Sequence, residues 1–260
     1  MATSERRADP LVARRSAAGW GAWLRALLDR GERQLAALGL TLAVGFVTGL
    51  VSLYAFAVLA DEVLRQQTDL LDLLVLAQLQ QFKSPTLDLL ARVVSFMGSE
   101  GVAIIGVLLV AALAWRGRWG AAGGLVLAAG GAQLLNDVLK GEFHRVRPSP
   151  VLGMLPVQAF SFPSGHAMVS AAFYTCLAYL SWRVLHGWAR PVCTAGLLLL
   201  VLAIGLSRLY LGVHYFTDVV AGYLAGFLWT DAVILGGHVL ARGRVRPTAA
   251  RSPKSEAAKC

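Results

Sequence analysis

The chain alternates between long apolar runs and short polar segments. Residues 35–60 contain no charged side chain, and about 20 apolar residues are enough for a helix to cross a bilayer. Shorter apolar runs follow at 101–115, 119–135, 167–182, 191–206 and 219–230. With their flanking residues, the six runs each predict a membrane-spanning helix. We therefore predict an all-α, polytopic membrane protein folded as a bundle of six transmembrane helices.

The composition agrees with a membrane protein. Hydrophobic residues make up 57% of the 260 residues and charged residues 15%, whereas soluble domains carry about 25% charge. The pattern divides the chain into a basic N-terminal segment (1–34), a six-helix membrane domain (35–241) and a basic, disordered tail (242–260). Three scattered cysteines indicate neither a disulfide framework nor a metal site.

The formal charge of +9 raises the question of nucleic-acid binding, but the positions of the basic residues favour another explanation. Most of them lie in residues 1–34, 116–118, 183–190 and 242–259, all on one side of a six-span topology. The positive-inside rule makes that side cytoplasmic. We expect a multi-pass cell-membrane protein with both termini cytoplasmic, and a basic excess that serves topology and lipid attraction rather than nucleic acid.

Three polar segments fall on the opposite, outer side: KGEFHRVRP at 140–148, PSGH at 163–166 and SRLYLGVHYFTD at 207–218. Together they resemble the signature of the type 2 phosphatidic acid phosphatase superfamily, which contains lipid-phosphate phosphatases and the vanadium haloperoxidases. The family pattern is K-x6-R-P, then P-S-G-H, then S-R-x5-H-x3-D. The matching positions are Lys140, Arg147, Pro148, Pro163, Ser164, Gly165, His166, Ser207, Arg208, His214 and Asp218.

These residue types suit phosphoryl transfer. Lys140, Arg147 and Arg208 supply three cations that can cradle phosphate oxygens, although headgroup contact would explain any one of them alone. Ser164 and Gly165 open a predicted helix, and the free N–H groups of a helix start bind anions. No carboxylate cluster is placed to hold Mg²⁺, so we predict a metal-independent enzyme without a cofactor.

The two histidines suit different roles. His214 and Asp218 are four residues apart, hence on one helical face if the last span begins by His214, and an aspartate on one ring nitrogen aims the other outward as a nucleophile. A hydrogen bond at the membrane interface is the alternative for this pair alone. His166 lacks such a neighbour in sequence, so we assign it as general acid. The resemblance implies the same roles: a phosphohistidine on His214, protonation of the lipid oxygen by His166, then hydrolysis.

The predicted function is hydrolysis of a lipid phosphate or diphosphate at the outer, periplasmic face. Residues 149–162 form a short, largely apolar loop, which leaves little room for a cap over a soluble substrate. A lipid phosphotransferase using the same histidine remains an alternative, as does a non-catalytic transporter or scaffold, which paired histidines disfavour. Undecaprenyl diphosphate, phosphatidylglycerol phosphate and phosphatidic acid all fit, and the oligomeric state stays open.

Two further features allow two interpretations each. Residues 63–82 are rich in leucine with interspersed polar side chains, which favours a connecting helix on the outer membrane surface over a substrate gate. Arg145 is either a ligand for a second phosphate or an ordinary surface charge.

Overall fold

A computed structural model describes residues 39, 43–148 and 160–243 of the chain. The predictions for residues 1–34, for most of the C-terminal tail and for the 149–159 loop concern parts outside these residues. Every regular element in the described ranges is an α-helix, so the all-α prediction is confirmed there. The chain divides into two compact units, 1–47 and 48–260, and the contacts described below belong to the second.

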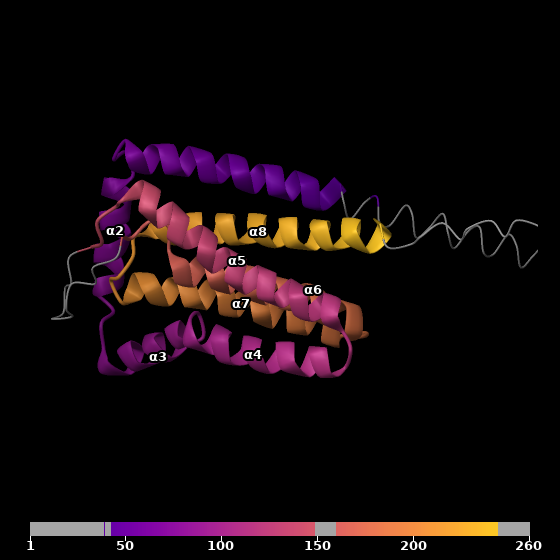
Figure 1. Cartoon of the computed structure of the whole chain (residues 1–260). Coiled ribbons are helices and arrows are strands. Elements are labelled where there is room, and N and C mark those ends of the chain that lie inside the picture. The colour runs from indigo at the N-terminus through magenta and orange to yellow at the C-terminus, as the bar shows by residue number, and fades with distance from the viewer. Residues whose placement is uncertain (1–38, 40–42, 149–159, 244–260) are drawn as a thin grey trace, which may run out of the picture. The chain divides into compact units, whose positions relative to one another are not determined.

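Short turns join most of the helices (Figure 1), whereas residues 144–164 separate α5 from α6. They are a first helix Ala43–Leu64, then α2 Asp69–Gln80, α3 Pro85–Phe96, α4 Glu100–Trp115, α5 Trp119–Phe143, α6 Gly165–Val184, α7 Ala189–Tyr210 and α8 Phe216–Gly243.

Within the described residues, five helical segments are long and apolar enough to cross a membrane: Ala43–Leu64, Pro85–Trp115, Trp119–Phe143, Ala189–Tyr210 and Phe216–Leu240. They correspond to five of the six predicted spans. The remaining one is α6, which packs against α5, α7 and α8 and buries most of residues 167–178. A helix that faces protein on most sides does not need the apolar surface of a lipid-facing helix. The sixth span therefore stays a prediction.

Close contact between α6 and α8 depends on two glycines of α8. A Cβ atom added at Gly222 would lie 2.6 Å from the carbonyl oxygen of Ser164, and one at Gly226 would lie 2.5 Å from that of Met168. Real side chains do not tolerate such distances, so only glycine allows this approach. As a result, the start of α8 lies against the start of α6, and the amide of Ser164 donates to the carbonyl oxygen of Asp218 at 2.9 Å.

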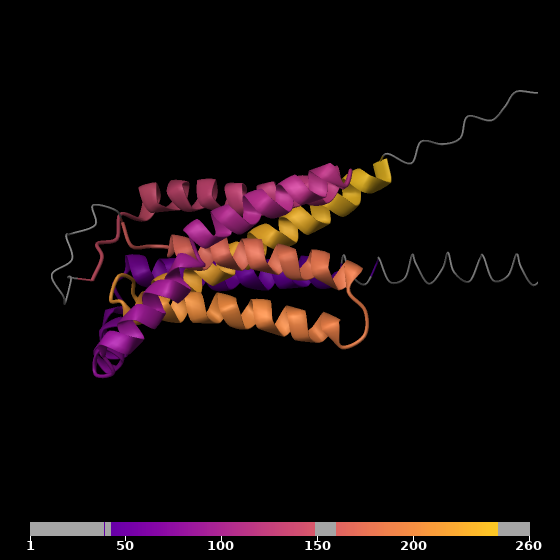
Figure 2. The same ribbon diagram turned by 90° about the horizontal axis from the view of Figure 1, so that it is seen from below.

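The helix from Pro85 to Trp115 is interrupted at residues 97–99, and Figure 2 shows α3 slanting across the bundle before the chain turns into α4. The break leaves the carbonyl of Met97 free to accept a hydrogen bond from the Tyr174 hydroxyl at 2.7 Å. A Cβ atom at Gly98 would lie 3.3 Å from Cδ2 of His166. The interruption thus brings backbone close to a predicted catalytic side chain.

Helix α2 lies across the end of the bundle at which α5 and α7 end and α6 and α8 begin (Figure 1). Its leucines at 70, 71, 73 and 74 are exposed, whereas Asp72 is completely buried. The segment 63–82 thus contains the predicted connecting helix, but with one carboxylate directed into the bundle. All three sequence motifs meet at this same end.

Candidate active site

His214 lies in the turn between α7 and α8 and is 1% exposed. Its Nδ1 is 3.4 Å from Oδ2 of Asp218 in the first turn of α8. The same oxygen accepts the backbone N–H of Tyr215 at 2.9 Å. The His–Asp distance exceeds that of a full hydrogen bond, but catalytic hydrogen bonds are often long without substrate and shorten in the complex. The two side chains therefore lie together, although His214 precedes Phe216, the first residue of α8, so the pair does not share a helical face as predicted.

The other nitrogen of His214 faces a cation. Nη1 of Arg147 is 3.4 Å from Nε2 of His214 and donates to the carbonyl oxygen of Val213 at 3.1 Å. Burial lowers the pKa of the Arg147 guanidinium, while the negative charge of Asp218 opposes that effect. An arginine remains charged at neutral pH despite such a shift, so Nε2 of His214 lies next to a fixed positive charge.

Burial also controls the ionisation of His214. It lowers the pKa of the imidazole to about 4, against the opposing influence of Asp218, and Arg147 and Arg208 act in the same direction as burial. The ring is therefore neutral at pH 7. A neutral imidazole is the form with a free lone pair, which a nucleophile requires.

The two remaining cations and the second histidine come from three helix ends. Lys140 lies in the last turn of α5, Arg208 in the last turn of α7, and His166 in the first turn of α6. Nη1 of Arg208 donates to Oγ of Ser95 on α3 at 2.6 Å. The charges of Arg208 and Lys140 act on His166, as does His214. Arg208, Lys140 and His214 thus all lie within electrostatic range of His166.

The PSGH turn is held by a residue that sequence reasoning missed. Nδ2 of Asn136 on α5 donates to the carbonyl oxygen of Pro163 at 3.2 Å. A Cβ atom at Gly165 would lie 2.8 Å from Oδ1 of Asn136, which explains why this position is glycine. Asn136 lies four residues before Lys140, so the same helical face that presents the lysine also supports the turn.

Several buried polar atoms at this end lack a hydrogen-bond partner among the described residues, including Ser164 Oγ, Arg208 Nε and His214 Nδ1. An unpaired polar atom in a dry environment costs about 1–3 kcal/mol. Nδ1 of His214 faces Asp218, whereas the Ser164 hydroxyl and Arg208 Nε are donors that suit an anion able to accept their hydrogen bonds. Ser164, Arg208 and His214 are all among the predicted site residues.

Arg145 is not the ordinary surface charge that the sequence allowed as one interpretation. Its side chain is 12% exposed and bridges three carboxylates: Nη1 lies 2.8 Å from Oδ1 of Asp218, and Nη2 lies 2.7 Å from Asp72 and 3.5 Å from Asp69. Burial alone would lower the pKa of this guanidinium, but the carboxylates outweigh burial and raise it. Surface charge is thus the wrong interpretation, and the positive charge is already compensated within the protein.

The bridge to Asp72 could not be found from the sequence. Thr217 completes it, since its hydroxyl donates to Asp72 and accepts from Arg145. No motif spacing connects residue 72 with 145 or 217. The one signal is an acidic residue inside the leucine run DLLDLLVL of 69–76, where a lone carboxylate needs a partner.

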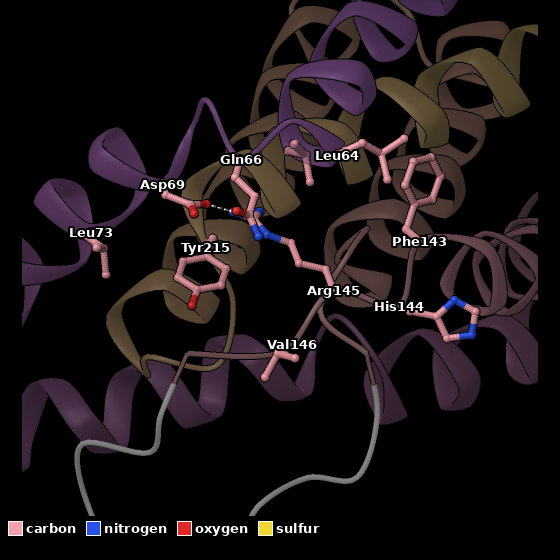
Figure 3. A pocket seen from close by; sticks show the side chains of 10 residues that line it. Leu64, Gln66, Asp69, Leu73, Phe143, His144, Arg145, Val146 and Tyr215 are labelled. Atoms are coloured by element: carbon pink, nitrogen blue, oxygen red, sulfur yellow. Dashed lines mark hydrogen bonds and ion pairs between the residues drawn. The ribbon is translucent and has the colours of Figure 1, made fainter.

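A cavity of about 400 Å³ opens beside Arg145 (Figure 3). Figure 3 shows the guanidinium directed toward Asp69, with Tyr215 beside it. The remaining lining comes mainly from the end of the first helix and from residues 143–146, and includes neither histidine of the predicted site. In the described ranges, no group of three or more His, Cys, Asp or Glu residues is arranged to hold a metal ion.

Comparison with known proteins identifies relatives in sequence. The model of the PAP2 superfamily matches residues 121–238. Phosphatidylglycerophosphatase B of Bacillus subtilis (strain 168) is 39% identical over 106 residues, which cover 40% of this chain and 52% of the relative. The putative undecaprenyl-diphosphatase YbjG of Escherichia coli (strain K12) is 44% identical over 70 residues, 26% of this chain and 30% of the relative. The chain thus matches about half the length of the first relative and less than a third of the second.

Solved structures extend the similarity to the fold. The crystal structure of a transmembrane PAP2 type phosphatidylglycerolphosphate phosphatase from Bacillus subtilis has a TM-score of 0.67 at 27% identity, covering 76% of this chain and 99% of that chain. Aquifex aeolicus LpxE has a TM-score of 0.52 at 26% identity, covering 63% and 94%. Residues 121–238, which contain all three motifs, therefore match the PAP2 superfamily, as the resemblance in the sequence predicted.

Proposed function

We propose that this protein is a membrane phosphatase that hydrolyses a lipid phosphate or lipid diphosphate through a phosphohistidine on His214. The observation that carries the proposal is the position of the His214 ring between two charges of opposite sign. Asp218 lies at 3.4 Å from Nδ1 and Arg147 at 3.4 Å from Nε2. An imidazole held in this way keeps its proton on Nδ1 and offers the lone pair of Nε2 where a phosphate would rest against the arginine.

The proposed reaction has two steps. Nε2 of His214 attacks phosphorus, the bond from phosphorus to the lipid oxygen breaks, and His166 gives that oxygen a proton. Water then attacks the phosphorus of the phosphohistidine and passes a proton to His166. The bond between phosphorus and Nε2 of His214 breaks, and inorganic phosphate leaves. Lys140, Arg147 and Arg208 neutralise charge on the equatorial oxygens, and Ser164 and Gly165 contribute donors at the start of α6. No metal ion takes part.

We further propose that α6 is the sixth span and that the site faces the outer side of the cell membrane. The basic segments support this orientation, because the active-site motifs lie at the ends of helices opposite the loops at 116–118 and 183–190. Two relatives bear names that specify lipid phosphates: phosphatidylglycerophosphatase B and a putative undecaprenyl-diphosphatase. A substrate with a phosphate at the membrane surface and its tail in the bilayer fits such a site.

The test is phosphate release by the purified full chain in detergent micelles, with phosphatidylglycerol phosphate, phosphatidic acid and undecaprenyl diphosphate offered separately. We expect inorganic phosphate from at least one lipid, and none from the His214→Ala variant. Transfer of the phosphoryl group to a second lipid, without release of inorganic phosphate, would favour the phosphotransferase. Binding without turnover of any of the three lipids would contradict the enzyme and favour a transporter or scaffold.

A further inference from the structure

We propose that Asp72 of α2 is a positioning residue of the catalytic centre, acting through Arg145 and Thr217 on the Asp218–His214 pair. This inference rests on the proposed function, since it assigns a role in the same reaction. It gives α2 a part in catalysis beyond that of a connecting helix. None of Asp72, Arg145 and Thr217 belongs to the motif positions that match the family signature.

Asp72 is held as a buried acceptor on both oxygens. Oδ1 accepts the backbone N–H of Thr217 at 2.9 Å, and Oδ2 accepts the Thr217 hydroxyl at 2.6 Å and Nη2 of Arg145 at 2.7 Å. Its side chain is completely buried. Removing an ionised carboxylate from water costs several kcal/mol, which hydrogen bonds and opposite charges must offset. Here those partners come from two other segments of the chain.

The position of Thr217 makes Asp72 a cap of α8. Thr217 is the second residue of that helix, so its N–H has no partner within the helix and points toward the N-terminal end. A carboxylate that accepts this N–H also interacts favourably with the positive end of the helix dipole. Asp72 therefore fixes, from a separate helix, the first turn in which Asp218 lies.

Arg145 transmits the same constraint to the Asp218 carboxylate itself. One guanidinium nitrogen, Nη1, donates to Oδ1 of Asp218 and to the Thr217 hydroxyl, both at 2.8 Å, while Nη2 is bound by Asp72. Because Oδ1 of Asp218 is held, Oδ2 stays directed at the Tyr215 amide and the His214 ring. Loss of the Asp72 carboxylate removes the shortest contact of Nη2 and leaves Asp69 at 3.5 Å as its remaining ion pair, so the carboxylate that orients the nucleophile loses part of its support.

A purely structural role for Asp72 would tie α2 to the bundle without affecting the chemistry. The two roles differ in how the Asp72→Asn variant combines with Asp218→Asn. If Asp72 acts through Asp218, its removal matters little once Asp218 no longer orients the ring. If Asp72 only maintains the folded fraction, Asp72→Asn lowers kcat/KM by the same factor in the wild-type and in the Asp218→Asn background.

The experiment measures kcat/KM for release of ³²P from phosphatidylglycerol phosphate labelled in its terminal phosphate, in purified full-length variants. We expect Asp72→Asn to lower kcat/KM by about 10- to 100-fold, mainly through kcat. This range is taken by analogy from residues that hydrogen-bond to the metal-ligating side chains of metalloenzymes. In the Asp218→Asn background the further loss should stay below about threefold. The matched control is Asp61→Asn in the first helix. It removes the carboxylate of an exposed ion pair with Arg65 and should leave kcat/KM unchanged.

Thr217 supplies a second test if Asp72→Asn folds poorly. Thr217→Val removes the bridging hydroxyl at constant shape and should also lower kcat/KM, whereas Thr217→Ser restores the hydroxyl and should recover most of the loss. Full activity of Thr217→Val, or equal losses by Asp72→Asn in the wild-type and Asp218→Asn backgrounds, would overturn the proposal.

A readout without turnover separates this inference from the proposed function. ¹⁵N NMR of histidine-labelled protein reports which ring nitrogen of His214 carries the proton, with the signal assigned by its absence in His214→Gln. We expect the Nδ1–H tautomer in the wild type and a mixture in Asp72→Asn. An unchanged tautomer would overturn the positioning role even if no lipid is hydrolysed. A changed tautomer in a protein that hydrolyses none of the three lipids would support the positioning role and contradict only the proposed function.

Discussion

Replacing Asp218 by asparagine should remove almost all turnover, and the contacts of Asp218 explain why. Its Oδ1 accepts from Arg145 at 2.8 Å, and its Oδ2 accepts from the Tyr215 amide at 2.9 Å and faces the His214 ring. An asparagine offers one oxygen and one NH₂ group, so one side must place a donor against a donor. The orientation of the amide then decides the outcome.

The two orientations differ in energy. A hydrogen bond to the charged guanidinium contributes about 1.5–3 kcal/mol and a neutral one about 0.5–1.5 kcal/mol. The amide oxygen should therefore stay on Arg145 and turn its NH₂ group toward His214. The ring must then accept on Nδ1 and carry its proton on Nε2, which removes the lone pair needed for attack. Loss of the carboxylate charge further destabilises the phosphohistidine.

The expected loss in kcat/KM is about 10³- to 10⁴-fold, by analogy with the same exchange in oriented catalytic triads. This corresponds to about 4–5.5 kcal/mol of transition-state stabilisation. The assay is ³²P release from labelled phosphatidylglycerol phosphate, with Asp61→Asn as control and thermal unfolding in detergent to show that the variant is folded. A folded Asp218→Asn variant that keeps more than a tenth of the wild-type kcat/KM would refute the tautomer argument.

Four further outcomes are expected. His166→Ala should lower kcat/KM about 10²- to 10⁴-fold on a monoester lipid but far less on p-nitrophenyl phosphate, whose leaving group needs no proton; equal losses would mean that His166 mainly binds phosphate. Activity should survive EDTA, because three side-chain cations neutralise charge, and vanadate should inhibit by bonding to His214; loss in EDTA that Mg²⁺ restores would point to a metal ion. The His214 ring should protonate only as the pH falls through about 4, since burial lowers its pKa to that value, and a ¹⁵N NMR midpoint near 6.5 would indicate a solvated imidazole. In intact cells, a cysteine at position 146, where Val146 is 79% exposed, should react with an impermeant maleimide and native Cys260 should not; the reverse would invert the topology.

The parts of the site that the sequence predicted are those with regular spacing. His214 lies four residues before Asp218, in the turn that leads into α8, and the PSGH segment opens α6, so contacts local in sequence bring these groups into position. Asp72 and Asn136 were missed because each reaches its partner across the bundle, through contacts that no periodicity encodes. The ion pairs of Arg145 with three carboxylates from α2 and α8 likewise follow from tertiary contacts, and they contradict only the surface-charge interpretation.

Helix boundaries show the same limit. The prediction placed a span at 101–115 and a connecting helix within 63–82, whereas the observed segment Pro85–Trp115 begins earlier than the predicted span and is interrupted at residues 97–99. The interruption is stabilised by Tyr174 of α6, a tertiary contact. Hydrophobicity identifies that a helix crosses the membrane; where the helix bends depends on what packs against it.

The burial of α6 also bears on how the protein is made. A nascent helix enters the bilayer according to its own hydrophobicity, and α6 is absent from the five described segments that are long and apolar enough by themselves. The surface of α6 is instead covered by neighbouring helices. Two of them, α7 and α8, are synthesised after α6. A growing chain that has reached only α6 therefore holds the PSGH segment without the two helices that later cover the buried face of α6. We expect the phosphate site to be assembled late, once the final hairpin has been synthesised.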